Sequence, residues 1–252
     1  LKMSESPLFA RLKSEGRVSK NPLVESFVHA KNRRLVMIAL FGATAGQGVV
    51  WYTGQFYALT FLQKPLNLHW TLAYTIVSTA LVLGTPFILY FGWLSDRIGR
   101  KGIMLTGCAL AALTYVPLYA GMKRLANPDL VASVTTLPSA AMIGLILIVF
   151  VQMVYVAMVY GPIAAFLVEL FPTAIRYTSM SLPYHLGNGW FGGFLPLIAT
   201  AATTSAWSAA VFGAGAIYTG LIYPILVCVL TLVVGGIYIR ETKDHKIDTP
   251  FH

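Results

Sequence analysis

Long tracts of this sequence contain no Asp, Glu, Lys or Arg, and they limit what the chain can fold into. They include residues 35–63, 102–122, 130–168 and 177–239. A helix needs about 20 residues to cross the hydrocarbon core of a bilayer, so the last tract has room for two spans and a turn. Because 57% of the residues are hydrophobic and only 11% are charged, the composition excludes a soluble domain and predicts an integral membrane protein.

Prolines, polar turns and charges divide the apolar sequence into six predicted transmembrane helices. We expect them at residues 35–62, 70–91, 102–121, 139–167, 177–203 and 215–239. A polar, basic lead-in (1–34) precedes them and a charged tail (240–252) follows. Gly161-Pro162 predicts a kink in the fourth helix, because proline removes a backbone donor. Pro183 and Pro196 predict bends in the fifth.

The distribution of basic residues predicts the orientation of the chain. Fifteen of the 18 Lys and Arg residues fall on the cytoplasmic side if the chain begins there, and only Lys64, Lys123 and Arg124 fall outside. This asymmetry matches the positive-inside rule. We therefore expect a multi-pass protein with both termini in the cytoplasm. The net charge of +9 does not indicate nucleic acid, since no basic patch outside the membrane carries interleaved aromatic residues.

Residues 92–101, GWLSDRIGRK, stand between the second and third predicted helices. An acidic and three basic side chains do not belong inside a bilayer, so we expect a short loop at the membrane face. The segment resembles the G-x-x-x-D-R-x-G-R-K signature of the major facilitator superfamily. Residues 169–176 resemble a second element of that superfamily, E-x6-R. The resemblance implies an all-α bundle of six helices, one half of a twelve-helix transporter that holds its substrate between two halves.

A finer resemblance covers essentially the whole chain and is strongest over residues 169–198, which include the segments 184–193 and 195–198. These segments are similar to the second half of the metabolite:proton symporters, bacterial relatives of the sugar porters. The resemblance implies the C-terminal half of an inner-membrane transporter whose partner is a missing N-terminal half. It implies substrates such as dicarboxylates, 2-oxoglutarate, shikimate, citrate, proline and betaine. Leu1 in place of Met, and a resemblance of residues 4–7 to the segment after a sixth helix, indicate a chain cut from a longer one.

Charges at the cytoplasmic face form a predicted gate, because ion pairs there can lock one transporter state and separate in the other. We expect Asp96 to accept from a neighbouring helix N-terminus or from Arg97. Arg100 and Glu169 are expected to pair across the bundle, with Arg176 at the far end of the network. The alternative interpretation is that these residues are ordinary interfacial anchors.

Three residues of the first helix, Gln47, Trp51 and Gln55, are spaced four apart and so share one face. Amides in hydrocarbon are costly unless they find partners or line a wet cavity. Two amides and an indole could bind the carboxylate or hydroxyl groups of a substrate. Hydrogen bonding between helices explains them equally well.

The fifth helix adds Tyr184, His185 and Asn188 as candidate binding residues within about one turn. Apart from tyrosines, His185 is the only ionisable side chain well inside a predicted span, and it could take part in proton coupling. A neutral histidine that donates to a nearby carbonyl is the alternative. Tyr155 on the fourth helix is a further candidate, with packing as its default role.

Small-residue pairs predict close contacts between helices. Gly42 and Gly46 form one such pair, and Gly189 and Gly193 form another. No spacing of metal ligands, phosphate-binding loop or nucleophile–base arrangement occurs in the sequence, and both cysteines lie in apolar segments. We expect no metal, no cofactor and no enzymatic activity.

The sequence therefore predicts half of a proton symporter for a small organic anion or zwitterion. The six predicted spans contain no Asp or Glu, so a carboxylate used for coupling must come from the other half. Two alternatives stay open. One is a uniporter or exchanger of the same fold, and the other is a non-transporting membrane fragment that needs a partner.

Overall fold

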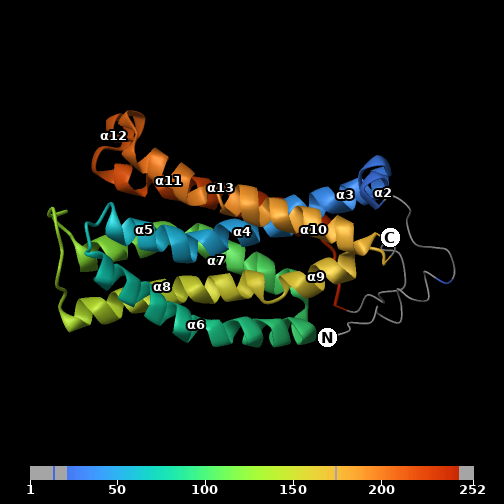
Figure 1. The fold of residues 1–252 in the computed structure, drawn as a ribbon, viewed down its shortest axis with the longest axis horizontal. Helices are drawn as coiled ribbons and strands as arrows, with labels where there is room; N and C mark the ends of the chain where they lie inside the picture. The colour runs from blue at the N-terminus through green and yellow to red at the C-terminus, as the bar shows by residue number, and fades with distance from the viewer. Residues whose placement is uncertain (1–13, 15–21, 174, 244–252) are drawn as a thin grey trace.

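The structure is a computed structural model that describes residues 14, 22–173 and 175–243, and within them it is a bundle of helices (Figure 1). Most of the basic lead-in, with the segment 4–7, and tail residues 244–252 lie outside this part. A short helix, α2 (Pro22–Val28), precedes the bundle. The helices run side by side between two ends. We call the end where α3 begins and α13 ends the inner end, and the opposite end, with residues 127–138, the outer end.

The first predicted span is one continuous helical column, Ala30–Gln63. Two π-helical segments interrupt its α-helical geometry, and its parts are α3 (Ala30–Ala39), η1 (Leu40–Thr44), α4 (Ala45–Tyr52), η2 (Thr53–Tyr57) and α5 (Ala58–Gln63). A π turn holds more residues than an α turn, and such turns are frequent at functional sites.

The predicted loop at residues 92–101 is wrong. α6 (Trp70–Ile98) and α7 (Arg100–Ala126) include these residues, and only Gly99 separates the two helices. Gly99 adopts a φ of +109°, which side chains disfavour, and a Cβ there would collide with the Glu241 carboxylate. The charged motif therefore lies on two helix ends joined by a one-residue turn.

The outer loop is also shorter than predicted. α7 continues to Ala126, which places Lys123 and Arg124 in its last turn. Cations at that position interact favourably with the negative end of the helix dipole. The link from α7 to α8 therefore begins at residue 127 instead of 122.

The kink in the fourth span is confirmed, since α8 (Ser139–Tyr160) and α9 (Ile163–Leu170) meet at Gly161-Pro162. The last span starts earlier than predicted, with α12 (Ala206–Phe212) and the 3₁₀ segment η4 (Gly213–Leu221) before α13 (Ile222–Tyr238). The Ser205 side chain caps α12 by accepting from the backbone N–H of Ser208 at 3.1 Å.

Five helices among the described residues are long and apolar enough to cross a membrane. The predicted fifth span, 177–203, is not one of them because its helix is interrupted. It consists of α10 (Arg176–Leu186), the π-helical η3 (Gly187–Gly192) and α11 (Leu195–Thr204). The interruption lies at residues 193–194, whereas Pro183 stays inside α10. The pieces still follow one another along the bundle (Figure 1).

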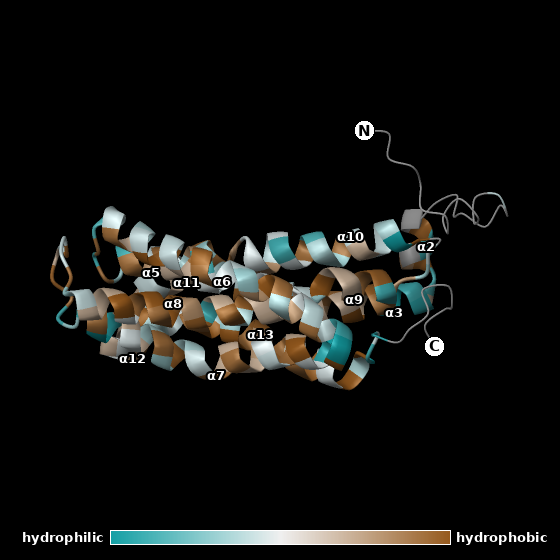
Figure 2. Cartoon of the chain, turned by 90° about the horizontal axis from the view of Figure 1, so that it is seen from below, coloured by the Kyte–Doolittle hydropathy of each residue, from teal (hydrophilic) through white to brown (hydrophobic). Residues whose placement is uncertain are grey.

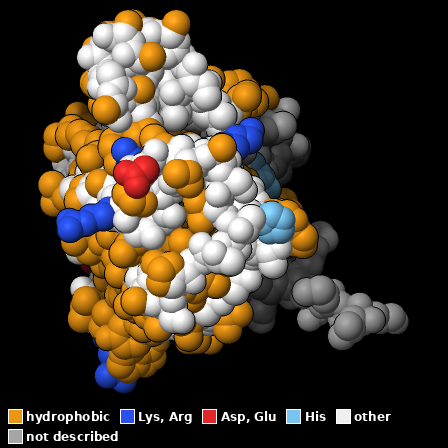
Figure 3. Space-filling model, turned by 90° about the vertical axis from the view of Figure 1, so that its left-hand side faces the viewer, with side chains coloured by type: hydrophobic (Ala, Val, Ile, Leu, Met, Phe, Trp, Pro, Cys, Tyr) orange, Lys and Arg blue, Asp and Glu red, His pale blue; other side chains and the backbone are white. Residues whose placement is uncertain are grey.

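The core and the surface agree with an all-α integral membrane bundle. A large apolar cluster fills the space between the helices, and a smaller one, with Phe166 and Phe171, lies toward the inner end. Hydrophobic residues extend over most of the helix length, with hydrophilic colour at the start of α3 (Figure 2). Seen from the outer end, charged side chains are few and scattered among hydrophobic ones (Figure 3).

The first glycine pair packs as predicted, and the second does not. A Cβ on Gly42 would come within 3.2 Å of the Gly235 Cα on α13, and one on Gly46 within 2.7 Å of Thr231. A Cβ on Gly189 would meet nothing within 4 Å, and the nearest atoms to a Cβ on Gly193 would be those of residue 189. Gly187 makes the close contact of this segment instead, as described next.

The backbones of α4 and η3 touch at Gly48 and Gly187, where a Cβ on Gly48 would collide with the Gly187 carbonyl. We expect Gly48→Ala to lower the free energy of unfolding by about 1–3 kcal/mol, because overpacking forces the backbones apart. Chemical unfolding in detergent would measure the change. Gly236→Ala is the matched control, since its Cβ would meet nothing within 4 Å. Equal stability of both variants would contradict the prediction.

Candidate functional site

The Arg100 guanidinium is the centre of a charge cluster at the inner end, which we call the clamp. The Arg100 side chain is 8% exposed, and its Nη2 lies 2.9 Å from Oε1 of Glu169 on α9. Nε also donates to Glu169 Oε2 at 3.3 Å, and Nη1 donates to Ser95 Oγ at 2.6 Å. Asp96 forms a further ion pair with Nη1. The predicted Arg100–Glu169 pair is therefore present, and it ties α7 to α9.

The residues after α13 complete the clamp, which the sequence analysis missed. Thr242 donates from its hydroxyl to Glu169 Oε2 at 2.6 Å. The Glu241 carboxylate accepts hydrogen bonds from four backbone N–H groups. The donors are Arg100 (2.7 Å), Lys101 (3.1 Å), Thr242 (2.9 Å) and Lys243 (3.2 Å). Two of these donors open α7, so Glu241 satisfies N–H groups that have no partner inside that helix.

The electrostatics of Glu241 follow from these bonds. Burial acts to raise the pKa of the carboxyl, but the hydrogen bonds from the backbone N–H groups stabilise the charged form more. The pKa of Glu241 is therefore lowered from its ordinary value of 4.5.

Asp96 and Arg97 have different contacts from those expected. Asp96 pairs with Arg100 rather than with Arg97 or a helix N-terminus. The Arg97 guanidinium instead lies 4.0 Å from the centre of the Trp93 ring. Arg176 donates from Nε to the Phe171 carbonyl at 3.0 Å, which bridges the two ends of the connection between α9 and α10.

Two of the predicted binding residues, Gln47 and Asn188, form a reciprocal amide pair between α4 and η3. Gln47 Nε2 donates to Asn188 Oδ1 at 3.1 Å, and Asn188 Nδ2 donates to Gln47 Oε1 at 3.0 Å. Asn188 also donates to the Tyr184 carbonyl at 3.0 Å. In this conformation Gln47 is 1% exposed, so the amides satisfy each other as helix–helix hydrogen bonding requires.

Aromatic residues extend from this pair to a cavity between α9 and α10. The centres of the Trp51 and Tyr160 rings lie 4.4 Å apart. Tyr160, Tyr184 and His185 all line the cavity, which holds about 330 Å³. The structure thus places five of the predicted binding residues around one polar and aromatic region: Gln47, Trp51, Tyr184, His185 and Asn188.

Gln55 and Tyr155 are placed differently. Gln55 Nε2 is buried and makes no hydrogen bond within the described part of the chain, so it is a spare donor one turn beyond Trp51. The Tyr155 hydroxyl accepts from Thr114 Oγ1 on α7 at 3.1 Å. Tyr155 therefore packs between α7 and α8, in its default role.

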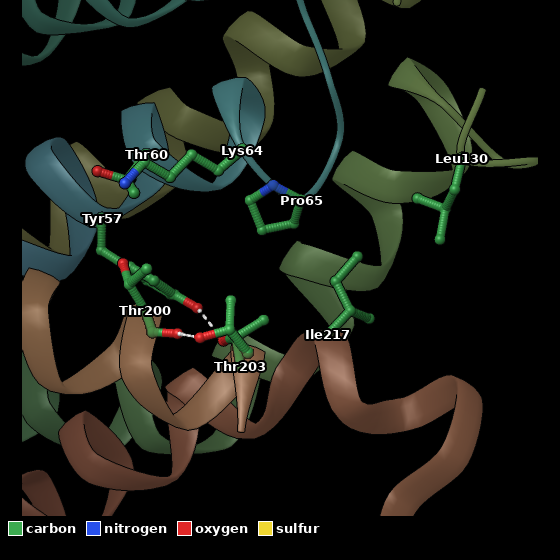
Figure 4. Close-up of a pocket in the computed structure, with 9 residues that line it drawn as sticks. Tyr57, Thr60, Lys64, Pro65, Leu130, Thr200, Thr203 and Ile217 are labelled. Atoms are coloured by element: carbon green, nitrogen blue, oxygen red, sulfur yellow. Dashed lines mark hydrogen bonds between the residues drawn. The ribbon is translucent and has the colours of Figure 1, made fainter. Parts of the chain in front are cut away.

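A second cavity of about 290 Å³ lies near the outer end. Figure 4 shows Tyr57 and Thr203 pointing toward each other there, and their hydroxyl oxygens are 3.3 Å apart. Thr203 also donates to the Ala199 carbonyl at 2.8 Å. Neutral hydroxyls thus connect the end of the first column to α11. Within the described residues, no group of three or more His, Cys, Asp or Glu side chains could hold a metal ion.

Comparison with known proteins identifies the family. The sequence profile named "Sugar (and other) transporter" matches residues 5–249. The chain belongs to this family. The profile is part of the major facilitator superfamily, so the resemblance of the two charged motifs is confirmed. No solved structure matches the chain.

Three curated bacterial relatives align with two thirds of the chain or nearly so. The ectoine/proline transporter ProP of Corynebacterium glutamicum is 30% identical over 65% of this chain and 29% of its own length. The α-ketoglutarate permease of Escherichia coli is 28% identical over 67% and 36%. The citrate-proton symporter of Klebsiella pneumoniae is 30% identical over 66% and 34%. This chain therefore spans about a third of the length of these relatives.

The two carboxylates that pair with Arg100 differ in burial, so their removal should have different costs. The Glu169 side chain is 13% exposed and that of Asp96 is 62% exposed. We expect Glu169→Gln to lower the free energy of unfolding by about 3 kcal/mol, because it removes the buried negative partner of the Arg100 guanidinium. The matched variant Asp96→Asn should cost less than about 1 kcal/mol, because solvent screens that pair. Chemical unfolding in detergent would measure both, and equal costs would contradict this account of the clamp.

The lowered pKa of Glu241 predicts how the clamp depends on pH. Its stabilisation is complete above the ordinary pKa of 4.5 and is lost as the pH falls through the lower pKa of the folded protein. We expect the Arg100 and Lys101 amides, measured by hydrogen exchange relative to intrinsic rates, to lose protection in that acidic range. Glu241→Gln should weaken protection at neutral pH and remove this transition. An unchanged transition in the variant would assign it to another group.

Proposed function

We propose that this chain is one half of a secondary transporter in a bacterial inner membrane, with its inner end in the cytoplasm. The transporter carries a small organic acid or zwitterion together with protons by alternating access. The missing N-terminal six-helix half is its partner. Family membership supports this proposal, as do relatives whose names specify ectoine/proline, α-ketoglutarate and citrate-proton transport.

The observation that carries the proposal is the polar and aromatic region around Trp51, Tyr184 and His185. His185 and Gly189 are exposed on the surface of α10 and η3. Trp190, beside them, is 67% exposed. An imidazole facing lipid is costly, so either a water-filled cavity or a partner half must cover this face. A substrate with a carboxylate would find hydroxyl, imidazole and amide donors here.

Proton coupling is the finer part of the proposal. We assign proton transfer to His185, because it presents an imidazole, a side chain suited to proton shuttling, beside this region. A carboxylate supplied by the other half is the second source of a coupled proton. The clamp supports alternating access, because ion pairs at the inner end must separate for that end to open.

Uptake into vesicles containing the purified full-length protein tests this proposal. With an inward proton gradient, we expect accumulation of labelled 2-oxoglutarate, citrate or proline, and a protonophore should abolish it. Asn188→Ala should raise KM roughly tenfold or more, since one hydrogen bond to a charged group contributes about 1.5–3 kcal/mol. Asn32→Ala is the matched control, because its amide donates to the Glu25 carbonyl outside the bundle.

Other outcomes distinguish the alternatives. Equilibration without accumulation would favour a uniporter or exchanger. Absence of uptake of all three compounds, despite normal stability, would overturn the organic-acid and zwitterion assignment and favour the non-transporting alternative.

A further inference from the structure

A small cavity at the inner end combines cationic and apolar side chains and takes no part in the clamp or the aromatic region. It holds about 160 Å³. Its lining includes Lys31, Arg34, Leu35, Ile38, Leu170 and Arg240. These residues come from α3, from the end of α9 and from the segment after α13.

The α3 side of this cavity changes from cationic to apolar along the helix. Lys31, Arg34, Leu35 and Ile38 are spaced i, i+3, i+4 and i+7, so they share one face of the helix. The two cations come first, at the inner end, and the two apolar residues lie deeper along the bundle. This order matches a ligand with an anionic head outside and an apolar body toward the membrane interior.

The charges on this face have no counter-ion in the described part of the chain. The first turn of α3 contains no acidic residue, and no described carboxylate pairs with Lys31 or Arg34. The Arg34 guanidinium instead lies 5.8 Å from the centre of the Tyr238 ring. Cations near a helix N-terminus are unfavourable because the dipole is positive there, so an external anion would stabilise this arrangement.

We propose that this cavity binds the phosphate headgroup of an anionic phospholipid from the leaflet at the inner end. A soluble phosphate would use the cations but gain nothing from Leu35, Ile38 and Leu170, whereas a lipid uses both. Basic pockets between membrane helices suit such headgroups. Tyr238, which also lines the cavity, is 50% exposed, so the cavity borders an exposed aromatic surface.

The site adjoins the clamp along the chain. Leu170 follows Glu169, and Arg240 precedes Glu241, so two of the clamp carboxylates are next to residues that line the cavity. A headgroup held between α3 and these two segments would therefore restrain the two chain segments that close the inner end. The lipid site itself does not depend on the transported substrate.

Native mass spectrometry of the detergent-purified protein with added phosphatidylglycerol tests this inference. We expect Lys31→Gln/Arg34→Gln to weaken phosphatidylglycerol binding roughly 25-fold, since each cation near an anionic lipid surface contributes about a factor of five. The charge-preserving pair Lys31→Arg/Arg34→Lys should keep binding within a few-fold, which separates loss of charge from misfolding. The matched control Lys123→Gln/Arg124→Gln removes two charges at the outer end and should leave binding unchanged.

Several results would overturn the proposal. Equal losses in the inner and outer charge-removal variants would indicate general attraction to lipid rather than a site. Equal binding of phosphatidylcholine would remove the role of headgroup charge. Glycerol phosphate that binds as tightly as the lipid and displaces it would assign the cavity to a soluble phosphate.

Discussion

A buried guanidinium at the inner end determines how several distant segments meet. Arg100 is shielded from solvent, and a charge in such a place is tolerated only when acceptors surround it. The acceptors come from the end of α6 and from Glu169 on α9, and Thr242 in turn donates to Glu169. A movement that separates α9 from α7 removes an acceptor from a buried cation. Such a movement is therefore costly unless other acceptors replace the lost ones.

Backbone contact and irregular helix geometry coincide in the first and fifth columns. The three π-helical segments contain Gly42, Gln55 and Asn188, which are a packing glycine and two candidate binding residues. Polar groups freed or displaced by these turns must find partners, since lipid offers none. The Thr44 hydroxyl, for example, donates to the Pro183 carbonyl at 2.7 Å. Local distortion thus occurs where the polar side chains of the candidate site need to meet.

The same distortions explain where prediction from sequence succeeded and failed. Charge-free tracts located the helical columns because desolvation of charge is the dominant cost in a membrane. The Arg100–Glu169 pair was predictable because both residues belong to recognisable motifs. The predicted helix contact at Gly189 was wrong, because a π turn changes the direction in which residues point relative to the 3.6-residue periodicity of an α-helix. Glu241 was missed because a carboxylate after the last helix resembles any solvated tail until the chain folds back onto α7.

The two ends of the bundle are held by different interactions, and this asymmetry bears on alternating access. At the outer end, neutral groups make the connections, such as Tyr57 with Thr203 and the Asn127 amide with the Leu66 carbonyl at 2.9 Å. Each neutral hydrogen bond contributes about 1 kcal/mol net and can be replaced by water. Opening the inner end instead unpairs the buried charges of Arg100 and Glu169. For the transporter that we propose, we therefore expect the outer end to open at lower cost than the inner end, whose opening needs compensation from a bound substrate or from the proposed partner half.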